Sequence, residues 1–149
     1  MVNIGFAGLC VRTYAAGYLN KQEVLTTTGP YARTRNPLYL GSGMLTLGAA
    51  AALHSVWAAA LLVVYFTLVY SLVMRREEME LRQKHGDAFS AYATAVPLFF
   101  PRLFGASRAA TTGAGFSWAQ YRKNHEYEAA FGFIVLLIGL VLIWWLRSR

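Results

Sequence analysis

The sequence predicts an all-α membrane protein, a multi-pass transmembrane bundle of about four membrane helices with cytoplasmic loops and interfacial helices. Three observations support this. Of the 149 residues, 56% are hydrophobic and 14% are charged, whereas about 25% of the residues in a soluble domain are charged. The apolar residues are gathered into long runs, and most basic residues lie in the segments that flank these runs. The length predicts a single domain, 1–149.

Three of the runs have the length of a membrane helix. Residues 56–74 contain no charge over 19 positions, close to the roughly 20 residues that span a bilayer. Residues 129–146 form a second run with a Trp pair near its end, as is typical of a membrane interface. Residues 38–53 form a third, separated from the first by His54 and Ser55 alone. The runs 38–53 and 56–74 therefore predict a tight transmembrane hairpin.

The N-terminal segment, residues 1–19, has helical length but contains Arg12 near its middle. It lacks the basic start and uninterrupted apolar core of a signal peptide. Two alternatives stay open. Either Arg12 snorkels or faces a polar cavity, or the segment is the inner part of a longer helix, and the chain is then a short form of a larger protein.

The net charge of +7 is distributed as the positive-inside pattern requires, since the basic residues flank the apolar runs. This places loops 20–37 and 75–128 in the cytoplasm, in a membrane we expect to be prokaryotic, and favours lipid head groups over nucleic acid as partners. Arg147 and Arg149 fall on the outer side, against the rule. The lone Cys10 excludes a disulfide, and the three histidines lack the spacing of metal ligands.

The first polar island, residues 20–41, holds most of the stretch "TTTGPYARTRNPLYLGSG", residues 26–43. Gly29-Pro30 and Asn36-Pro37 are turn signals. Between them, Tyr31, Arg33 and Arg35 alternate, which in an extended backbone places all three on one side. Asn36 stands where a helix cap belongs, beside free backbone N–H groups that suit an anionic group. A plain interfacial loop is the competing interpretation.

The second polar island follows residues 56–74 and opens with "RREEMELR". For Glu80 and Arg82 we expect a solvated helix end, and helical spacing brings Glu78 near Arg82. The adjacent carboxylates of Glu77 and Glu78 lie at the depth of the first island and suit a cation placed between or beside them. His85-Gly86-Asp87 then predicts a break in the helix, after which Phe89 and Tyr92 share a face.

These two islands resemble the isoprenylcysteine carboxyl methyltransferases and the related phospholipid N-methyltransferases. That family has "GxYxxxRHPxYxG", a helical hairpin, and then "EExxLxxxFGxxYxxYxxxVPxxxP". The order, the spacing and the hairpin agree over roughly residues 20–102. Two positions depart from the pattern: Asn36 replaces the usual His, and His85 the usual Phe. Because Asn also forms hydrogen bonds, we expect cofactor binding to survive the first change.

The resemblance implies an S-adenosylmethionine-dependent methyltransferase without a Rossmann sheet, which releases S-adenosylhomocysteine. It places the cofactor between the two islands, beside carboxylates and aromatic faces that suit its two cationic groups and beside Arg or helix N-terminal amides that suit its carboxylate. The implied cofactor-binding residues are Glu23, Val24, Leu25, Thr26, Tyr31, Arg35, Asn36, Pro37, Leu38, Tyr39, Glu77 and Glu78.

The implied acceptor is a lipid or a lipid-linked small molecule that enters from the bilayer, with O, N or S as the methylated atom left open. Arg75 and Glu78 are the candidate catalytic residues, and Arg75, Arg76 and His125 the candidate substrate contacts. For the segment 116–149 we favour an interfacial helix and a last membrane helix, with Asn124, His125 and Glu126 as a lesser candidate for the acceptor entrance. A membrane NADPH-dependent reductase and a non-catalytic membrane subunit are the alternatives, and the sequence leaves monomer or homodimer open.

Overall fold

The computed structural model describes residues 2–20, 24–52, 55–102 and 115–147. Within these ranges the chain contains helices and no strand, which confirms the all-α prediction. The elements are α1 (Val2–Tyr18), the short 3₁₀ helix η1 (Gly29–Ala32), α2 (Pro37–Ala52), α3 (Val56–Ala95), α4 (Trp118–Lys123) and α5 (Tyr127–Arg147).

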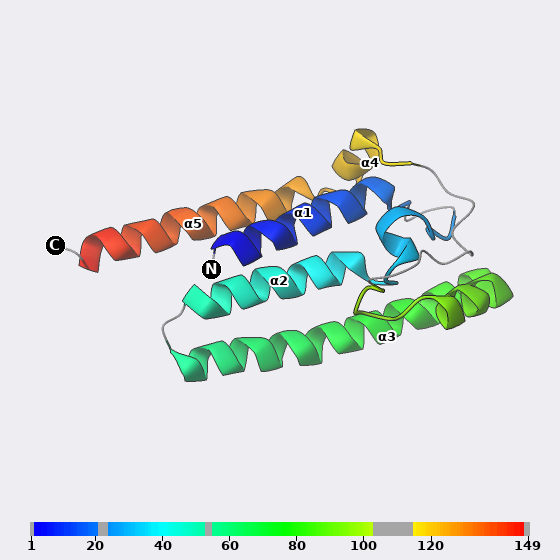
Figure 1. Cartoon of the computed structure of the whole chain (residues 1–149), viewed down its shortest axis with the longest axis horizontal. Coiled ribbons are helices and arrows are strands. Elements are labelled where there is room, and N and C mark those ends of the chain that lie inside the picture. The colour runs from blue at the N-terminus through cyan, green and yellow to red at the C-terminus, as the bar shows by residue number, and fades with distance from the viewer. Residues whose placement is uncertain (1, 21–23, 53–54, 103–114, 148–149) are drawn as a thin grey trace.

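The four longer helices lie roughly along a common axis, and the chain runs through each in the opposite direction to the one before it (Figure 1). α1 packs along α2, α2 packs against α3, and α5 contacts α1. The helices α2 and α3 form the predicted hairpin, although His54 of its turn lies outside the described residues. The polar segments therefore meet at the end of the bundle opposite the α2–α3 turn.

The contact between α1 and α2 depends on two glycines. A Cβ atom at Gly8 would lie 2.6 Å from the carbonyl oxygen of Gly41, and one at Gly41 would lie 2.6 Å from the carbonyl oxygen of Gly8. Only glycine allows two helix backbones to approach this closely. The approach brings the side chain of Arg12 on α1 against the first turns of α2.

The apolar half of α3 is open to its surroundings: Val56, Trp57 and Leu61 are 81%, 86% and 72% exposed. Among the described residues, α3 is the one helix long and apolar enough to cross a membrane. α1 and α2, with 17 and 16 residues, fall short of the roughly 20 residues of a typical span. Four membrane spans therefore stay a prediction.

The predicted helix break at Gly86 is present as a kink inside α3. Gly86 has φ 52° and ψ −122°, a conformation that glycine reaches without a steric penalty. Beyond the kink, Phe89, Tyr92 and Val96 form a small buried core with Leu25 and Leu81. The kink thus brings the end of α3 against the first polar island.

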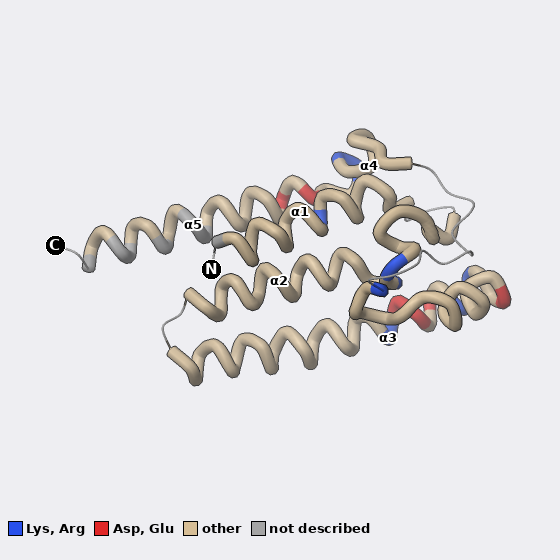
Figure 2. Tube along the Cα trace, viewed as in Figure 1, with Lys and Arg blue, Asp and Glu red and all other residues tan. Residues whose placement is uncertain are grey.

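Charged residues gather at the polar end of the bundle and near the start of α5 (Figure 2). The described parts of α2 and of the α3 segment 56–74 carry no acidic or basic residue. This separation is the one that a bilayer selects, because charged side chains are costly within its hydrocarbon core.

Candidate functional site

Hydrogen bonds join the first polar island to the segment that follows α3. The backbone N–H of Arg35 donates to the carbonyl of Pro97 at 2.9 Å, and that of Arg102 donates to the carbonyl of Arg33 at 3.0 Å. The side chains add further bonds: Thr34 Oγ1 to the Phe99 carbonyl at 2.9 Å, Asn36 Nδ2 to the Leu98 carbonyl at 3.0 Å, and Tyr92 Oη to the Tyr31 carbonyl at 2.7 Å. The proline-rich strip after α3 therefore fixes the conformation of the first island.

The first island is not extended between its turns, so the expectation that Tyr31, Arg33 and Arg35 share one side is wrong. Gly29 has φ 59°, Pro30 enters the first turn of η1, and the Arg33 N–H donates to the Pro30 carbonyl. This tight turn buries Tyr31, which is 6% exposed, while Arg33 lies on the surface. The turn chemistry of Gly-Pro thus overrides the alternation of the polar residues.

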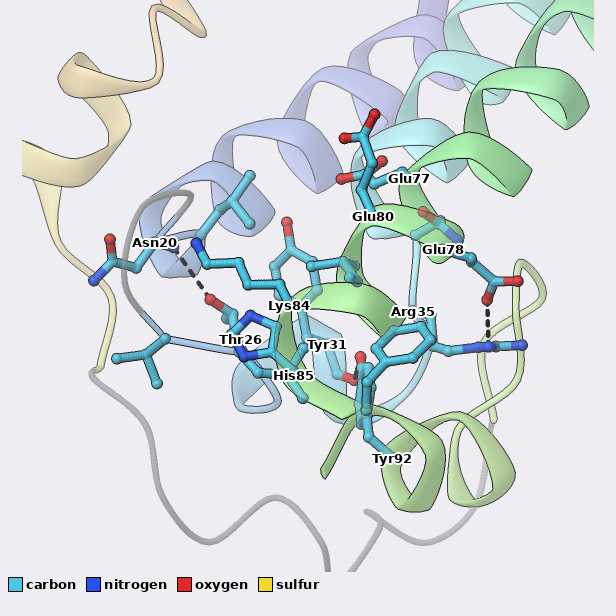
Figure 3. A pocket seen from close by; sticks show the side chains of 16 residues that line it. Asn20, Thr26, Tyr31, Arg35, Glu77, Glu78, Glu80, Lys84, His85 and Tyr92 are labelled. Carbon is cyan, nitrogen blue, oxygen red and sulfur yellow. Dashed lines mark hydrogen bonds and ion pairs between the residues drawn. The ribbon is translucent and has the colours of Figure 1, made fainter. Parts of the chain in front are cut away.

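A cavity of about 350 Å³ lies between the first island and α3, within the roughly 300–1,000 Å³ of small-molecule sites. Figure 3 shows Asn20 and Thr26 on one side of it and Glu77 and Glu78 of α3 on the other. Its wall is formed by Leu19, Asn20, Val24, Leu25, Thr26, Tyr31, Arg35, Asn36, Glu77, Glu78, Glu80, Leu81, Lys84, His85, Phe89 and Tyr92. We call it the first cavity.

A second cavity, of about 250 Å³, adjoins it on the side of α1 and α2. It is lined by Arg12, Leu19, Tyr31, Arg35, Asn36, Pro37, Leu38, Tyr39, Glu77 and Glu126. The two cavities share Leu19, Tyr31, Arg35, Asn36 and Glu77. They are therefore neighbouring compartments separated by these five side chains.

The two adjacent carboxylates of α3 have different partners. Glu78 forms an ion pair with Arg35, and Arg76 pairs with Glu80 at 3.0 Å, so the expected proximity of Glu78 and Arg82 does not give an ion pair. Glu77 instead accepts a hydrogen bond from the Tyr39 hydroxyl at 2.9 Å. Among the described residues it has no cationic partner, so its negative charge at the boundary of the two cavities is not neutralised.

Two buried donors at this boundary have no hydrogen-bond partner among the described residues: Tyr31 Oη and Arg35 Nε. Burial, followed by the nearby charge of Glu77, raises the pKa of Tyr31 well above its ordinary value of 10. The Tyr31 side chain therefore stays a neutral hydroxyl donor at physiological pH. Leaving such a group unpaired in a protein interior costs about 1–3 kcal/mol, a cost that a ligand with an acceptor atom removes.

The structure brings most of the predicted cofactor residues to these two cavities. Glu23 lies outside the described residues. The other eleven predicted cofactor residues line one or both of the cavities. Arg75, Arg76 and His125 line neither: Arg75 is exposed, Arg76 is 81% exposed in its pair with Glu80, and His125 contacts Tyr127. Of the candidate catalytic and substrate residues, Glu78 lies on the wall of the first cavity, and Glu126, from the lesser candidate set for the acceptor entrance, lies on the wall of the second.

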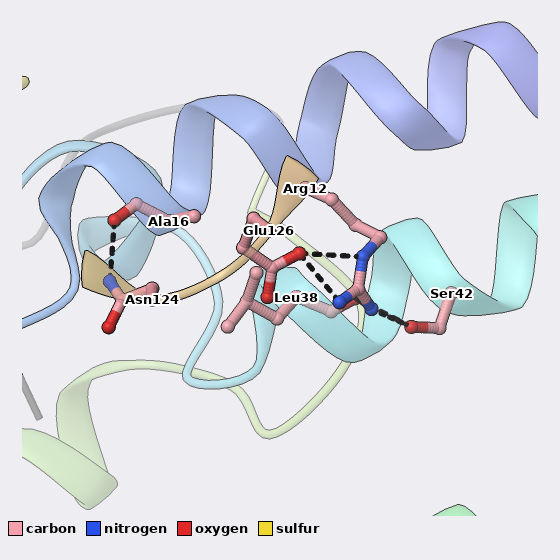
Figure 4. Close-up of polar contacts among 6 residues, drawn as sticks. All are labelled: Arg12, Ala16, Leu38, Ser42, Asn124 and Glu126. Carbon is pink, nitrogen blue, oxygen red and sulfur yellow. Dashed lines mark hydrogen bonds and ion pairs between the residues drawn. The ribbon is translucent and has the colours of Figure 1, made fainter. Parts of the chain in front are cut away.

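The sequence left the role of Arg12 open and gave Glu126 only as a lesser candidate for the acceptor entrance, and the structure brings both to the second cavity. Glu126 Oε2 accepts hydrogen bonds from Arg12 Nε at 3.0 Å and from Arg12 Nη2 at 2.7 Å, and Arg12 Nη1 donates to Ser42 Oγ (Figure 4). Arg12 thus faces a polar cavity, as one of the alternatives expects, and the alternative of a longer helix stays a prediction. A charge inside an apolar helix was the available signal for Arg12, but nothing in the sequence linked it to a residue 114 positions away.

This fold is a helical bundle with an apolar helix of membrane-spanning length, two motif-built islands and a polar cavity of small-molecule size. The chain belongs to the phospholipid methyltransferase family, whose model matches residues 3–88. The match confirms the resemblance and begins before the predicted boundary at residue 20, so it includes Arg12 on α1. It ends before Glu126.

Two curated relatives carry names that refer to metal resistance. The chain is 35% identical over 109 residues to the nickel-cobalt-cadmium resistance protein NccN of Alcaligenes xylosoxydans xylosoxydans, an alignment that covers 69% of this chain and 51% of the relative. It is 34% identical over 109 residues to the cobalt-zinc-cadmium resistance protein CzcN of Cupriavidus metallidurans, with 69% and 50% covered. The chain thus spans about half the length of these relatives. No solved structure matches the chain significantly.

Proposed function

We propose that this protein transfers a methyl group from S-adenosylmethionine to a lipid or lipid-linked acceptor at the cytoplasmic face of a prokaryotic membrane. Membership of a methyltransferase family supports the class of reaction. The observation that supports the cofactor is the boundary between the two cavities, where an unneutralised carboxylate, Glu77, lies beside the unpaired buried donors Tyr31 Oη and Arg35 Nε.

The residues present fit this cofactor. Its ammonium and sulfonium groups call for a carboxylate and for aromatic faces, and its own carboxylate calls for N–H and O–H donors. Glu77 supplies the first, Tyr31 and Arg35 supply the second, and Val24, Leu25 and Phe89 give the first cavity apolar walls. Pro37, Leu38 and Tyr39 line the second cavity instead, so in this proposal they lie at the reacting end.

S-Adenosylmethionine supplies an activated methyl group, so the protein mainly aligns a nucleophile behind the methyl carbon and excludes water. Such alignment contributes on the order of 7 kcal/mol or more. In the reaction the acceptor atom forms a bond to the methyl carbon, the bond from that carbon to sulfur breaks, and S-adenosylhomocysteine leaves. The hydrogen bonds between the islands hold the walls for this alignment, because they fix residues 33–36 to residues 97–102.

Calorimetric titration of the purified chain with S-adenosylmethionine tests the proposal, with NADPH as the comparison ligand. We expect saturable binding of S-adenosylmethionine, no binding of NADPH, and loss of binding in Glu77→Ala. The exposed Glu128→Ala, a carboxylate that lines neither cavity, is the matched control. Incubation with methyl-labelled cofactor and a native lipid extract, followed by mass analysis, then identifies the acceptor. NADPH binding would favour the reductase, and absence of labelled product would favour the non-catalytic subunit.

A further inference from the structure

The second cavity has a chemical character that the cofactor does not use. Resting on the proposed function, we propose that this cavity is the acceptor subsite. We further propose that Glu126 selects acceptors whose reacting head group donates hydrogen bonds over acceptors that present a carboxylate. Glu126 lies outside the family match, so this selection is a property of the C-terminal segment of this chain.

The position of the second cavity suits an acceptor. It shares Tyr31, Asn36 and Glu77 with the first cavity, so a group held there lies next to whatever the first cavity holds. Its other walls come from α1, from the first turn of α2 and from Glu126, the residue directly before α5. The helices α1, α2 and α5 continue away from the polar end (Figure 1), and their sequences are largely apolar there, so an acceptor with an apolar tail has an adjacent apolar path.

The hydrogen bonds around the second cavity use up most of its donors and leave an acceptor atom available to a ligand. The guanidinium of Arg12 is engaged by Glu126, by Ser42 and, at 3.5 Å, by the Leu38 carbonyl. Glu126 uses Oε2 for both of its bonds, and Oε1, which points away from the guanidinium in Figure 4, has no partner among the described residues. Glu77 also uses only Oε2, but the proposed function gives its carboxylate to the cationic groups of the cofactor. The bonding capacity that remains for an acceptor therefore lies in Glu126 Oε1.

This oxygen favours a head group with N–H or O–H donors and disfavours a carboxylate. Tyr31 Oη and Arg35 Nε, the unpaired donors that also line this cavity, are assigned above to the carboxylate of the cofactor. Without Glu126, the guanidinium of Arg12 would face the cavity unpaired and would attract an anion. Arg12 is 19% exposed and Glu126 is 8% exposed, so solvent screens this charge only weakly. The ion pair between Arg12 and Glu126 thus determines whether the subsite attracts a hydrogen-bond donor or an anion.

Glu126 is held in place by bonds between the α4–α5 turn and the end of α1. Gln120 Nε2 donates to the Leu19 carbonyl at 2.6 Å, and Asn124 Nδ2 donates to the carbonyls of Ala16 and Leu19 at 2.9 Å each. His125 then adopts φ 56°, a left-handed conformation, in the turn between α4 and α5. The turn caps the last carbonyls of α1 and directs Glu126 toward Arg12, so the carboxylate is positioned before any ligand arrives.

Binding of two small matched probes, n-octylamine and octanoate, tests the proposal. Each is titrated into the purified full chain with and without S-adenosylhomocysteine. The wild type should bind octylamine more tightly, and Glu126→Gln should shift the ratio of the two affinities toward octanoate by about tenfold or more. The exposed Glu128→Gln, in the first turn of α5 and two residues further along the chain, should keep the wild-type ratio.

The contrary outcomes are separate from those of the proposed function. Preference of the wild type for octanoate, no saturable binding of either probe, or an unchanged ratio in a folded Glu126→Gln protein would overturn the acceptor subsite. Should Glu126→Gln fail to fold, the double variant Arg12→Gln/Glu126→Gln removes both charges and should abolish the preference, and a preserved preference would refute the proposal. Because the titrations without cofactor do not require cofactor binding, failure to bind S-adenosylmethionine sinks only the proposed function.

Discussion

At the scale of single residues, Tyr31 is the side chain whose environment is hardest to explain without a ligand. It is 6% exposed, and its hydroxyl has no partner among the described residues. Tyr31→Phe should therefore raise the free energy of unfolding of the ligand-free protein by about 1 kcal/mol, because it removes a buried unpaired group, and should weaken S-adenosylmethionine binding about tenfold. Thermal unfolding and calorimetry measure the two effects. Tyr65→Phe, at an exposed position of α3, should change neither.

The same burial makes stability sensitive to alkaline pH. Burial raises the pKa of Tyr31 and that of Tyr92 above the ordinary value of 10. Below pH 10 both are neutral whether the chain is folded or unfolded, so their contribution is constant. Above pH 10 the unfolded chain loses these protons first, and stability falls by up to about 1.4 kcal/mol per pH unit for each tyrosine. Tyr31→Phe and Tyr92→Phe should each flatten this decline in unfolding experiments between pH 9 and pH 12, and equal slopes would contradict the expectation.

At the scale of elements, the kink in α3 places Phe89 and Tyr92 in the wall of the first cavity. Gly86→Ala places a Cβ in open space, so its cost is confined to the backbone angles and should be about 1–3 kcal/mol. If α3 straightens to avoid this strain, Phe89 and Tyr92 leave the wall and S-adenosylmethionine affinity falls. Gly132→Ala in α5 is the matched control, since it also meets open space but has helical angles and should be neutral or stabilising. Equal stability of the two variants would contradict this role of the kink.

The elements also show what the sequence could and could not predict. The apolar runs 38–53 and 56–74 fixed the hairpin, and the two motifs gathered most of the cavity wall, because spacing along a helix and turn residues are local signals. Pairing across elements is not local. Nothing along the chain indicated that Glu78 pairs with Arg35 rather than with Arg82, or that Arg12 pairs with Glu126, because these contacts depend on how the helices pack.

At the scale of the whole molecule, the charges gather at the end of the bundle that holds both cavities. The four longer helices alternate in direction (Figure 1), so residues of the second polar island and of α4 lie at one end and the α2–α3 turn at the other. In a membrane, basic residues favour the cytoplasmic side. The charge pattern and the helix directions are both those expected for the proposed topology, in which both cavities face the cytoplasm.

Cysteine accessibility tests that topology in a Cys10→Ser background. Single cysteines are introduced at three exposed positions: Ser55 before α3, Arg82 in α3 and Arg122 in α4. In intact cells an impermeant thiol reagent should label Ser55→Cys, and it should label Arg82→Cys and Arg122→Cys only after the cells are lysed. Labelling of Arg122→Cys in intact cells would place α4 across the membrane from α3. That result would separate Glu126 from the motif residues of α3, and the contact between α1 and the α4–α5 turn described here would be incompatible with it.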